Sequence, residues 1–384
     1  MLGRVFRIFA GPRRQLRHLA ALSHLASTTR YERDTPPCDA PHPTTRPDPR
    51  RSKRHGLAAG LVPAAAALVL AVAASLALGT AHIPLSSVWQ ALTAYDPGDT
   101  QQLIIREVRV PRTVIGVLTG VALGLAGAVM QAVARNPLAD PGILGVNAGA
   151  ALFVVVAINS LGLDTLSGYV WFGFAGALCA FALVYGVSSL GREGATPIKL
   201  ALAGAATTAA LGSITSAIIL TSNNAFEQYR FWQVGALTRT EDGLLVQAAP
   251  FIAAGAACAL LSGRWLNTLS LGDDTARALG QRVGAVRALA ACAVVLLCGT
   301  ATAIAGPIAF VGLVIPHIAR AFTGPDYRWI LPYSALLAPT LLLTADVVGR
   351  LIARPGELQV GIVTAVIGVP PFIALVRRRR TGAL

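Results

Sequence analysis

The chain has 384 residues, of which 54% are hydrophobic and 13% charged, and its mean hydropathy is +0.61. This polar content is too small to cover a water-soluble globule, so the composition argues against a soluble enzyme and indicates a membrane protein with several spans. The formal net charge of +14 is unevenly distributed, because residues 1–55 carry 12 of the 32 Lys and Arg residues against four acidic residues.

The first segment, residues 1–56, is basic and rich in proline, with seven Pro before position 56. A segment with this charge and no regular apolar spacing is predicted to be a disordered cytoplasmic tail or to rest on anionic lipid. We do not interpret it as a signal peptide, because the first long apolar run begins only at Leu57 and is too long for the hydrophobic part of such a peptide.

Eight apolar runs after this tail are long enough for membrane-spanning helices, each needing about 20 residues. They are residues 57–79, 113–134, 142–160, 169–190, 200–222, 243–263, 329–352 and 360–376. The second run carries Gly116, Gly120, Gly124 and Gly127, a spacing that lets another helix approach closely and predicts tight packing within the bundle.

A polar link, RNPLADPG at 135–142, joins the second and third runs. Pro137 and Pro141 are predicted to end one helix and begin the next, whereas Arg135, Asn136 and Asp140 are expected to be satisfied by water or by a soluble partner. A plain solvated turn is the alternative interpretation.

A second polar segment, residues 264–287, is charged and long enough for two short helices. It is too polar to insert into a membrane, so it is either a solvated loop or a docking surface for a soluble protein. The compact sequence LGDDTARALG at 271–280 favours the docking surface.

A ninth apolar run, residues 288–319, has 32 residues without Asp, Glu, Lys or Arg, which is too long for one span and short for two. Two spans place both termini in the cytoplasm with 25 basic residues inside and seven outside, as the positive-inside rule requires. We therefore predict an all-α polytopic membrane protein with about ten transmembrane helices. Two short segments are expected to meet at Gly306-Pro307, and broken helices of this kind often line transport paths.

No nucleotide or metal site is expected in this chain. Its two lysines, Lys53 and Lys199, do not follow a GxxxxG motif, so another subunit must handle any ATP. Asp346 is the one acidic residue in a predicted span, with Arg350 one turn later as its ion partner, so a proton relay is missing and a stand-alone secondary transporter is disfavoured. His317 is interpreted as a hydrogen-bonded structural residue rather than a metal ligand.

Five stretches together resemble the signature blocks of the FecCD-type permeases, which are membrane subunits of ABC importers for iron chelates, haem and vitamin B12. The stretches are 109–152, 271–280, 306–320, 344–350 and 357–373, and the resemblance covers about residues 57–380. The positions that match family motifs include Gln131, Asn136, Pro137, Asp140, Pro141, Gly145, Pro316 and His317.

The resemblance implies a permease domain over residues 57–380, with a cytoplasmic coupling region at 264–287. Its implied partners are a second copy or a paralogue, two ATPase subunits, an extracytoplasmic substrate-binding protein and membrane lipid, but no nucleic acid. The implied ATPase-coupling residues are Leu271, Gly272, Asp273, Asp274, Ala276, Leu279 and Gly280. Thr196, Pro197 and Ile198 match the family's cytoplasmic gate region.

Three arginines, Arg109, Arg112 and Arg350, resemble those that grip acidic residues of the binding protein. We expect them at water-exposed helix ends, where they would guide docking by charge.

The function implied is transport rather than catalysis: ATP-driven translocation of a ferric siderophore across the cytoplasmic membrane by alternating access. The chain itself is expected to bind no cofactor, with ATP and Mg held by the partner ATPase. Haem or cobalamin import is the alternative within the family.

Overall fold

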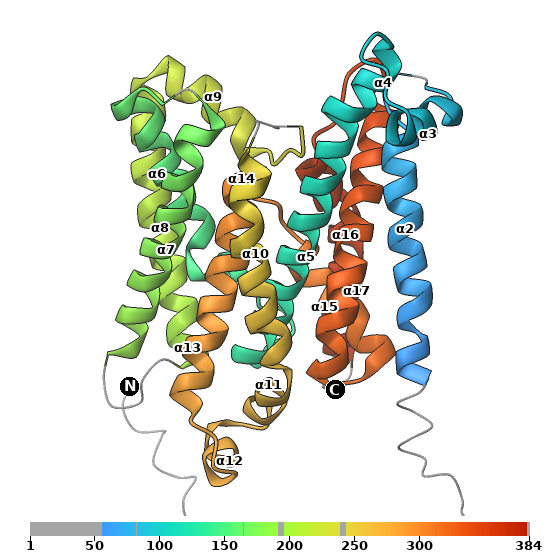
Figure 1. The fold of residues 1–384 in the computed structure, drawn as a ribbon. Helices are drawn as coiled ribbons and strands as arrows, with labels where there is room; N and C mark the ends of the chain where they lie inside the picture. Colours follow the sequence, from blue (N-terminus) through green and yellow to red (C-terminus); the bar gives the residue numbers. More distant parts are fainter. Residues whose placement is uncertain (1–55, 82, 164, 191–195, 239–242, 382–384) are drawn as a thin grey trace, which may run out of the picture. The chain divides into compact units, whose positions relative to one another are not determined.

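The structure is a computed structural model that describes residues 56–81, 83–163, 165–190, 196–238 and 243–381, all within one compact unit, 50–384. The predicted tail lies outside these residues, apart from Gly56. All regular structure in the described part of the chain is helical (Figure 1).

The helices follow one another without long interruptions. In chain order they are α2 (Leu61–Ala77), α3 (Leu85–Thr93), α4 (Thr100–Ile104), the π-turn η1 (Ile105–Arg109), α5 (Val110–Val133), the 3-10 turn η2 (Pro141–Leu144), α6 (Val146–Leu161), α7 (Leu166–Ser189), α8 (Pro197–Thr221), α9 (Asn223–Gln233), α10 (Leu244–Leu261), α11 (Gly263–Ser270), α12 (Asp273–Ala278), α13 (Val283–Val294), the π-turn η3 (Val295–Gly299), α14 (Thr300–Ala305), α15 (Val311–Thr323), α16 (Tyr327–Ile352) and α17 (Val360–Thr381).

Ten apolar segments account for the predicted spans. Seven helical stretches in the described residues are long and apolar enough to cross a membrane: Gly56–Ala77, Thr100–Val133, Gly168–Ser189, Ile198–Thr221, Leu244–Leu261, Val283–Ala305 and Tyr327–Ile352. Three shorter apolar helices complete the set: Val146–Leu161, Val311–Thr323 and Val360–Pro370. The prediction of an all-α protein with about ten transmembrane helices is confirmed.

The long apolar run breaks at the predicted place. A continuous stretch from α13 through η3 to α14 ends at Ala305, and α15 begins at Val311. Gly306 has a φ of 75°, and a Cβ on it would overlap the carbonyl oxygen of Trp232, so glycine is required there. Pro307 cannot donate a backbone hydrogen bond to continue the helix. The first segment, Val283–Ala305, has 23 residues and is therefore a full span, so only the second segment is short.

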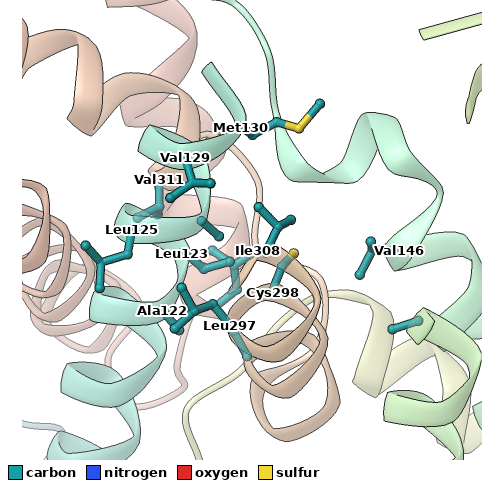
Figure 2. Close-up of a cluster of buried hydrophobic side chains, with 14 of the residues drawn as sticks. Ala122, Leu123, Leu125, Val129, Met130, Val146, Leu297, Cys298, Ile308 and Val311 are labelled. Carbon is teal, nitrogen blue, oxygen red and sulfur yellow. The ribbon is translucent and has the colours of Figure 1, made fainter. Parts of the chain in front are cut away.

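Helix α5 lies at the centre of the packed core, with most of its residues buried. Its glycine face meets α16 and α15: a Cβ on Gly120 would overlap the backbone of Pro339, and one on Gly127 would overlap the carbonyl of Gly312. The predicted close packing therefore occurs within the chain. Figure 2 shows part of this core, where Leu123 of α5 lies near Leu297 and Ile308.

The helix ends separate into two groups (Figure 1). The short helices α11 and α12 lie at the same end as the start of α2 and the end of α17, whereas α3, α4 and α9 lie at the other. The predicted topology places the start of the first span, the end of the last span and the 264–287 segment on one side, and the described helix ends are arranged in this way.

Candidate functional site

The predicted coupling region consists of two short helices, α11 and α12, as its length predicted. Gly272, with a φ of 114°, makes the turn between them. Leu271, Asp274 and Leu279 are exposed, whereas Ala276 is fully buried. The predicted coupling residues thus divide into an outward face that can meet a soluble partner and an inner face that holds α12 in place.

Asp273 belongs to the inner face and is the centre of a charge cluster. Its carboxylate lies 2.9 Å from Nη2 of Arg287 on α13, 3.6 Å from Nη2 of Arg135 in the α5–α6 link and 3.9 Å from Nη2 of Arg277. Its side chain is only 20% exposed, in contrast to the fully exposed Asp274. Asp273 therefore joins α12 to the α5–α6 link and to α13.

The α5–α6 link differs from the sequence prediction in how its polar groups are satisfied. Arg135, expected to meet water or a soluble partner, has a φ of 49° and pairs with Asp273. Asn136 Oδ1 accepts from the Leu138 amide at 3.0 Å, and Asp140 Oδ1 accepts from the Gly142 amide at 2.7 Å. The link is therefore held largely by contacts within the chain.

The two prolines of this link also act differently from each other. Helix α5 ends at Val133, before Pro137, whereas Pro141 occupies the first turn of η2 as predicted. Gly145, with a φ of 74°, turns the chain into α6, and Gln131 Nε2 donates to the Leu313 carbonyl of α15 at 3.1 Å.

A second connection joins the coupling region to α16. Asn267 of α11 donates from Nδ2 to Asp326 Oδ1 at 2.6 Å and accepts the Tyr327 amide at 2.7 Å. Partial burial would raise the pKa of Asp326, but hydrogen bonds from Arg328 and Asn267 lower the pKa to about 2. Sequence reasoning missed this connection; the available signal was Asp326 at the position of a helix N-cap.

The three arginines predicted to dock a binding protein are buried. Arg109 is 4% exposed, Arg112 4% and Arg350 2%, so the expectation of water-exposed helix ends is wrong. Each guanidinium makes contacts within the chain, so the docking role given to these residues stays a prediction. Arg106, Arg230 and Arg354 are the exposed arginines on the described part of this end.

An ion network explains this burial. Arg112 pairs with the fully buried Asp346 at 2.7 Å and with Glu357 at 2.7 Å, and Arg350 pairs with Asp346 at 3.0 Å, which confirms the predicted Asp346–Arg350 pair. Arg350 also donates to the carbonyls of Ser75 and Leu78. These contacts satisfy carbonyl groups that a helix end leaves unpaired.

Arg109 completes the same arrangement. Its guanidinium donates to the carbonyls of Leu76, Ala77 and Ala81 at 2.7 to 2.8 Å. Positive charge at the C-terminus of α2 is also favoured by the helix dipole. These arginines therefore fix the end of α2 against α5 and α16.

The remaining predicted residues lie at the start of α8 and within α15. Thr196 caps α8, accepting the Lys199 amide at 3.4 Å, Pro197 is the first residue of that helix, and Ile198 is exposed. Residues 191–195, the rest of the predicted gate region, lie outside the described residues. Pro316 is buried within α15, and the adjacent His317 makes contacts within the chain.

Ten apolar segments, with a break between two of them at Gly306-Pro307, and a polar pair of short helices at one end define a polytopic membrane protein. The FecCD transport family is matched over residues 67–378, and the chain belongs to this family. Its members are permease subunits of ABC importers in the inner membrane and are not catalytic themselves.

Similar proteins support this assignment. The ferric enterobactin transport system permease protein FepD of Escherichia coli K12 is 47% identical over 319 residues, covering 82% of this chain and 94% of FepD. The Fe(3+)-citrate import system permease protein YfmD of Bacillus subtilis 168 is 44% identical, covering 80% of this chain and 90% of YfmD. A solved metal-chelate type ABC transporter in an inward-facing conformation has a TM-score of 0.71 and 28% identity, covering 83% of this chain and 98% of the solved one.

Proposed function

We propose that this permease translocates a ferric siderophore across the cytoplasmic membrane by ATP-driven alternating access. It would act with a second copy or a paralogue, two ATPase subunits and an extracytoplasmic binding protein. We propose an iron chelate as the cargo because the chain is 47% and 44% identical to permeases whose names specify ferric enterobactin and Fe(3+)-citrate. Hemin and cobalamin permeases are also similar, at lower identity, and define the second candidate.

The coupling region supports the ATP-driven part of the proposal. Its exposed residues, Leu271, Asp274 and Leu279, form a small outward surface on which an ATPase subunit would bind. Asp273 connects that surface to the α5–α6 link and α13, and Asn267 connects α11 to α16. A displacement of α12 by the ATPases would therefore reach three membrane-spanning parts of the chain.

The opposite end would receive the binding protein. In this proposal the buried arginines Arg109, Arg112 and Arg350 do not touch the binding protein. They fix the ends of α2, α5 and α16 relative to one another beneath the surface on which it would dock. A direct grip by these arginines would require their internal bonds to open on docking. Thr196, Pro197 and Ile198 at the start of α8 remain the proposed gate region.

Uptake in a strain that lacks this gene tests the function. Iron-loaded siderophores, haem and labelled cobalamin would be supplied separately, with and without energy depletion. Loss of one energy-dependent ferric siderophore uptake, restored by the gene, is the expected result. Loss of only haem or cobalamin uptake would overturn the siderophore assignment, and unchanged energy-dependent uptake of all three would overturn the proposal as a whole.

A further inference from the structure

A cavity of about 490 Å³ lies between α11 and the start of α13, on the cytoplasmic side. Its lining includes Trp265 and Thr268 of α11, Gln281 and Arg282 of the connection between α12 and α13, and Ala285 and Leu289 of α13. Leu279 and Gly280 at the end of α12 also line it, so its mouth adjoins the surface proposed for the ATPase subunit. Its walls are polar near the connection and apolar along α13.

The polar part of the lining is chemically incomplete. Arg282 is its charged member, it is exposed, and within the described ranges no carboxylate lies at ion-pair distance from it. Gln281 donates from Nε2 to the Trp265 carbonyl at 2.9 Å, but its buried Oε1 has no hydrogen-bond partner in the described residues. A ligand that carries an anionic group would pair with Arg282, whereas the Gln281 oxygen is buried and lies out of a ligand's reach.

The apolar part continues into the membrane. A second cavity of about 460 Å³ lies further along the same helix, lined by Phe174, Phe181, Phe251, Cys292 and Leu296 among others. Ala285 and Leu289 of the first cavity and Cys292 and Leu296 of the second are spaced by four, three and four residues, so they share one helix face. The two cavities therefore follow one another along α13.

We propose that these two cavities form a binding site for one anionic phospholipid. The phosphate contacts Arg282, and an acyl chain lies along the α13 face from Ala285 to Leu296. Basic pockets at the cytoplasmic ends of membrane helices favour anionic head groups. Trp265, which is 47% exposed, belongs to the residue type that is enriched at the membrane interface.

The depth of the second cavity favours lipid over a protein partner. The span that contains α13 begins at Val283, and Cys292 lies nine residues further, roughly 14 Å along the helix axis. That distance reaches well into a hydrocarbon core of about 30 Å. A soluble ATPase subunit could touch the polar mouth but could not fill the apolar groove, whereas a phospholipid matches both.

Lipid binding to the purified full-length permease in detergent tests the proposal. Native mass spectrometry would compare added phosphatidylglycerol with phosphatidylcholine of the same chains. Preferential retention of phosphatidylglycerol is expected, and Arg282→Gln should weaken it about fivefold, the effect of one arginine near a charged membrane surface. Arg264→Gln is the matched control, because Arg264 is exposed on α11 but does not line the cavity.

A second variant, Ala285→Trp, fills the first cavity without changing charge and should reduce retention of both lipids. Equal retention of the two lipids by the wild type, or equal effects of Arg282→Gln and Arg264→Gln, would overturn the proposal. So would an Arg282→Gln variant that keeps its lipid but loses the ATPase subunit on purification, since the pocket would then belong to a protein contact. None of these measurements requires transport, so they are independent of the proposed cargo.

Discussion

Arginine side chains at the end of α2 act as replacements for a helix cap. Helix α2 ends at Ala77 with Leu78 as its C-cap, and carbonyl groups at this end accept from Arg109 and Arg350, while the carbonyl of Gly79 accepts from Arg354. A guanidinium suits this task because it offers five donors in one plane. The acidic partner Asp346 balances part of the buried positive charge.

Replacing Arg112 by Gln should destabilise the protein by about 3 kcal/mol, because a buried carboxylate loses a partner while Arg350 remains paired with it. The thermal unfolding of the detergent-purified permease would measure the effect. Arg106→Gln is the control, since Arg106 is exposed and rests over the Tyr95 ring at 4.4 Å, and we expect it to cost less than about 1 kcal/mol. Equal losses for the two variants would contradict the assigned role.

Asp326 gives the coupling region a dependence on pH. Its folded-state pKa is lowered to about 2 from an ordinary 3.8, so the carboxylate stabilises the folded state above pH 4 and this contribution is lost as the pH falls toward 2. Asp326→Asn should be less stable than the wild type at pH 6, and the difference should shrink as the pH falls below 4. Unfolding midpoints across this range would test it, and a difference that stays constant with pH would contradict the expectation.

At the scale of elements, α12 is held by charge rather than by apolar packing. Ala276 is its buried apolar contact, and the ion pairs of Asp273 with Arg135 and Arg287 connect it to the α5–α6 link and to α13. A short helix of six residues has little stability of its own, so these contacts fix its orientation. Its outward side chains are exposed, although Asp274 pairs with Arg277 of the same helix at 3.0 Å.

The two neighbouring aspartates are therefore expected to have different roles: Asp273 anchors α12 to the rest of the chain, and Asp274 contacts the ATPase subunit. Asp273→Asn should leave ATPase binding close to normal but lower transport per ATP hydrolysed by about tenfold, because α12 is no longer tied to α13. Asp274→Lys should instead weaken ATPase binding, since Asp274 is fully exposed. Co-purification of the ATPase and coupled uptake in proteoliposomes would distinguish the two. Unchanged transport in Asp273→Asn would show that the ion pairs carry no motion.

At the scale of the whole molecule, the two ends of the bundle differ. One end, which we propose is cytoplasmic, carries α11 and α12, which are linked to the α5–α6 link, α13 and α16, while the opposite end carries α3, α4 and α9 (Figure 1). Helix α5 contributes to both, because Arg112 lies near its start and the α5–α6 link follows its end. It is the element through which the two ends are physically continuous.

The sequence by itself determined the spans, the break at Gly306-Pro307 and the pair of short polar helices within 264–287. These features depend on the length of apolar runs, on glycine and proline geometry and on charge distribution, which are local properties of the chain. Only the tertiary structure decided the partners of the charged residues. Arg112 and Asp346 are 234 positions apart, and Arg135 and Asp273 lie on separate elements. An arginine at a helix end has the same sequence signature whether it faces water or a buried carboxylate, because burial depends on which distant helices pack around it.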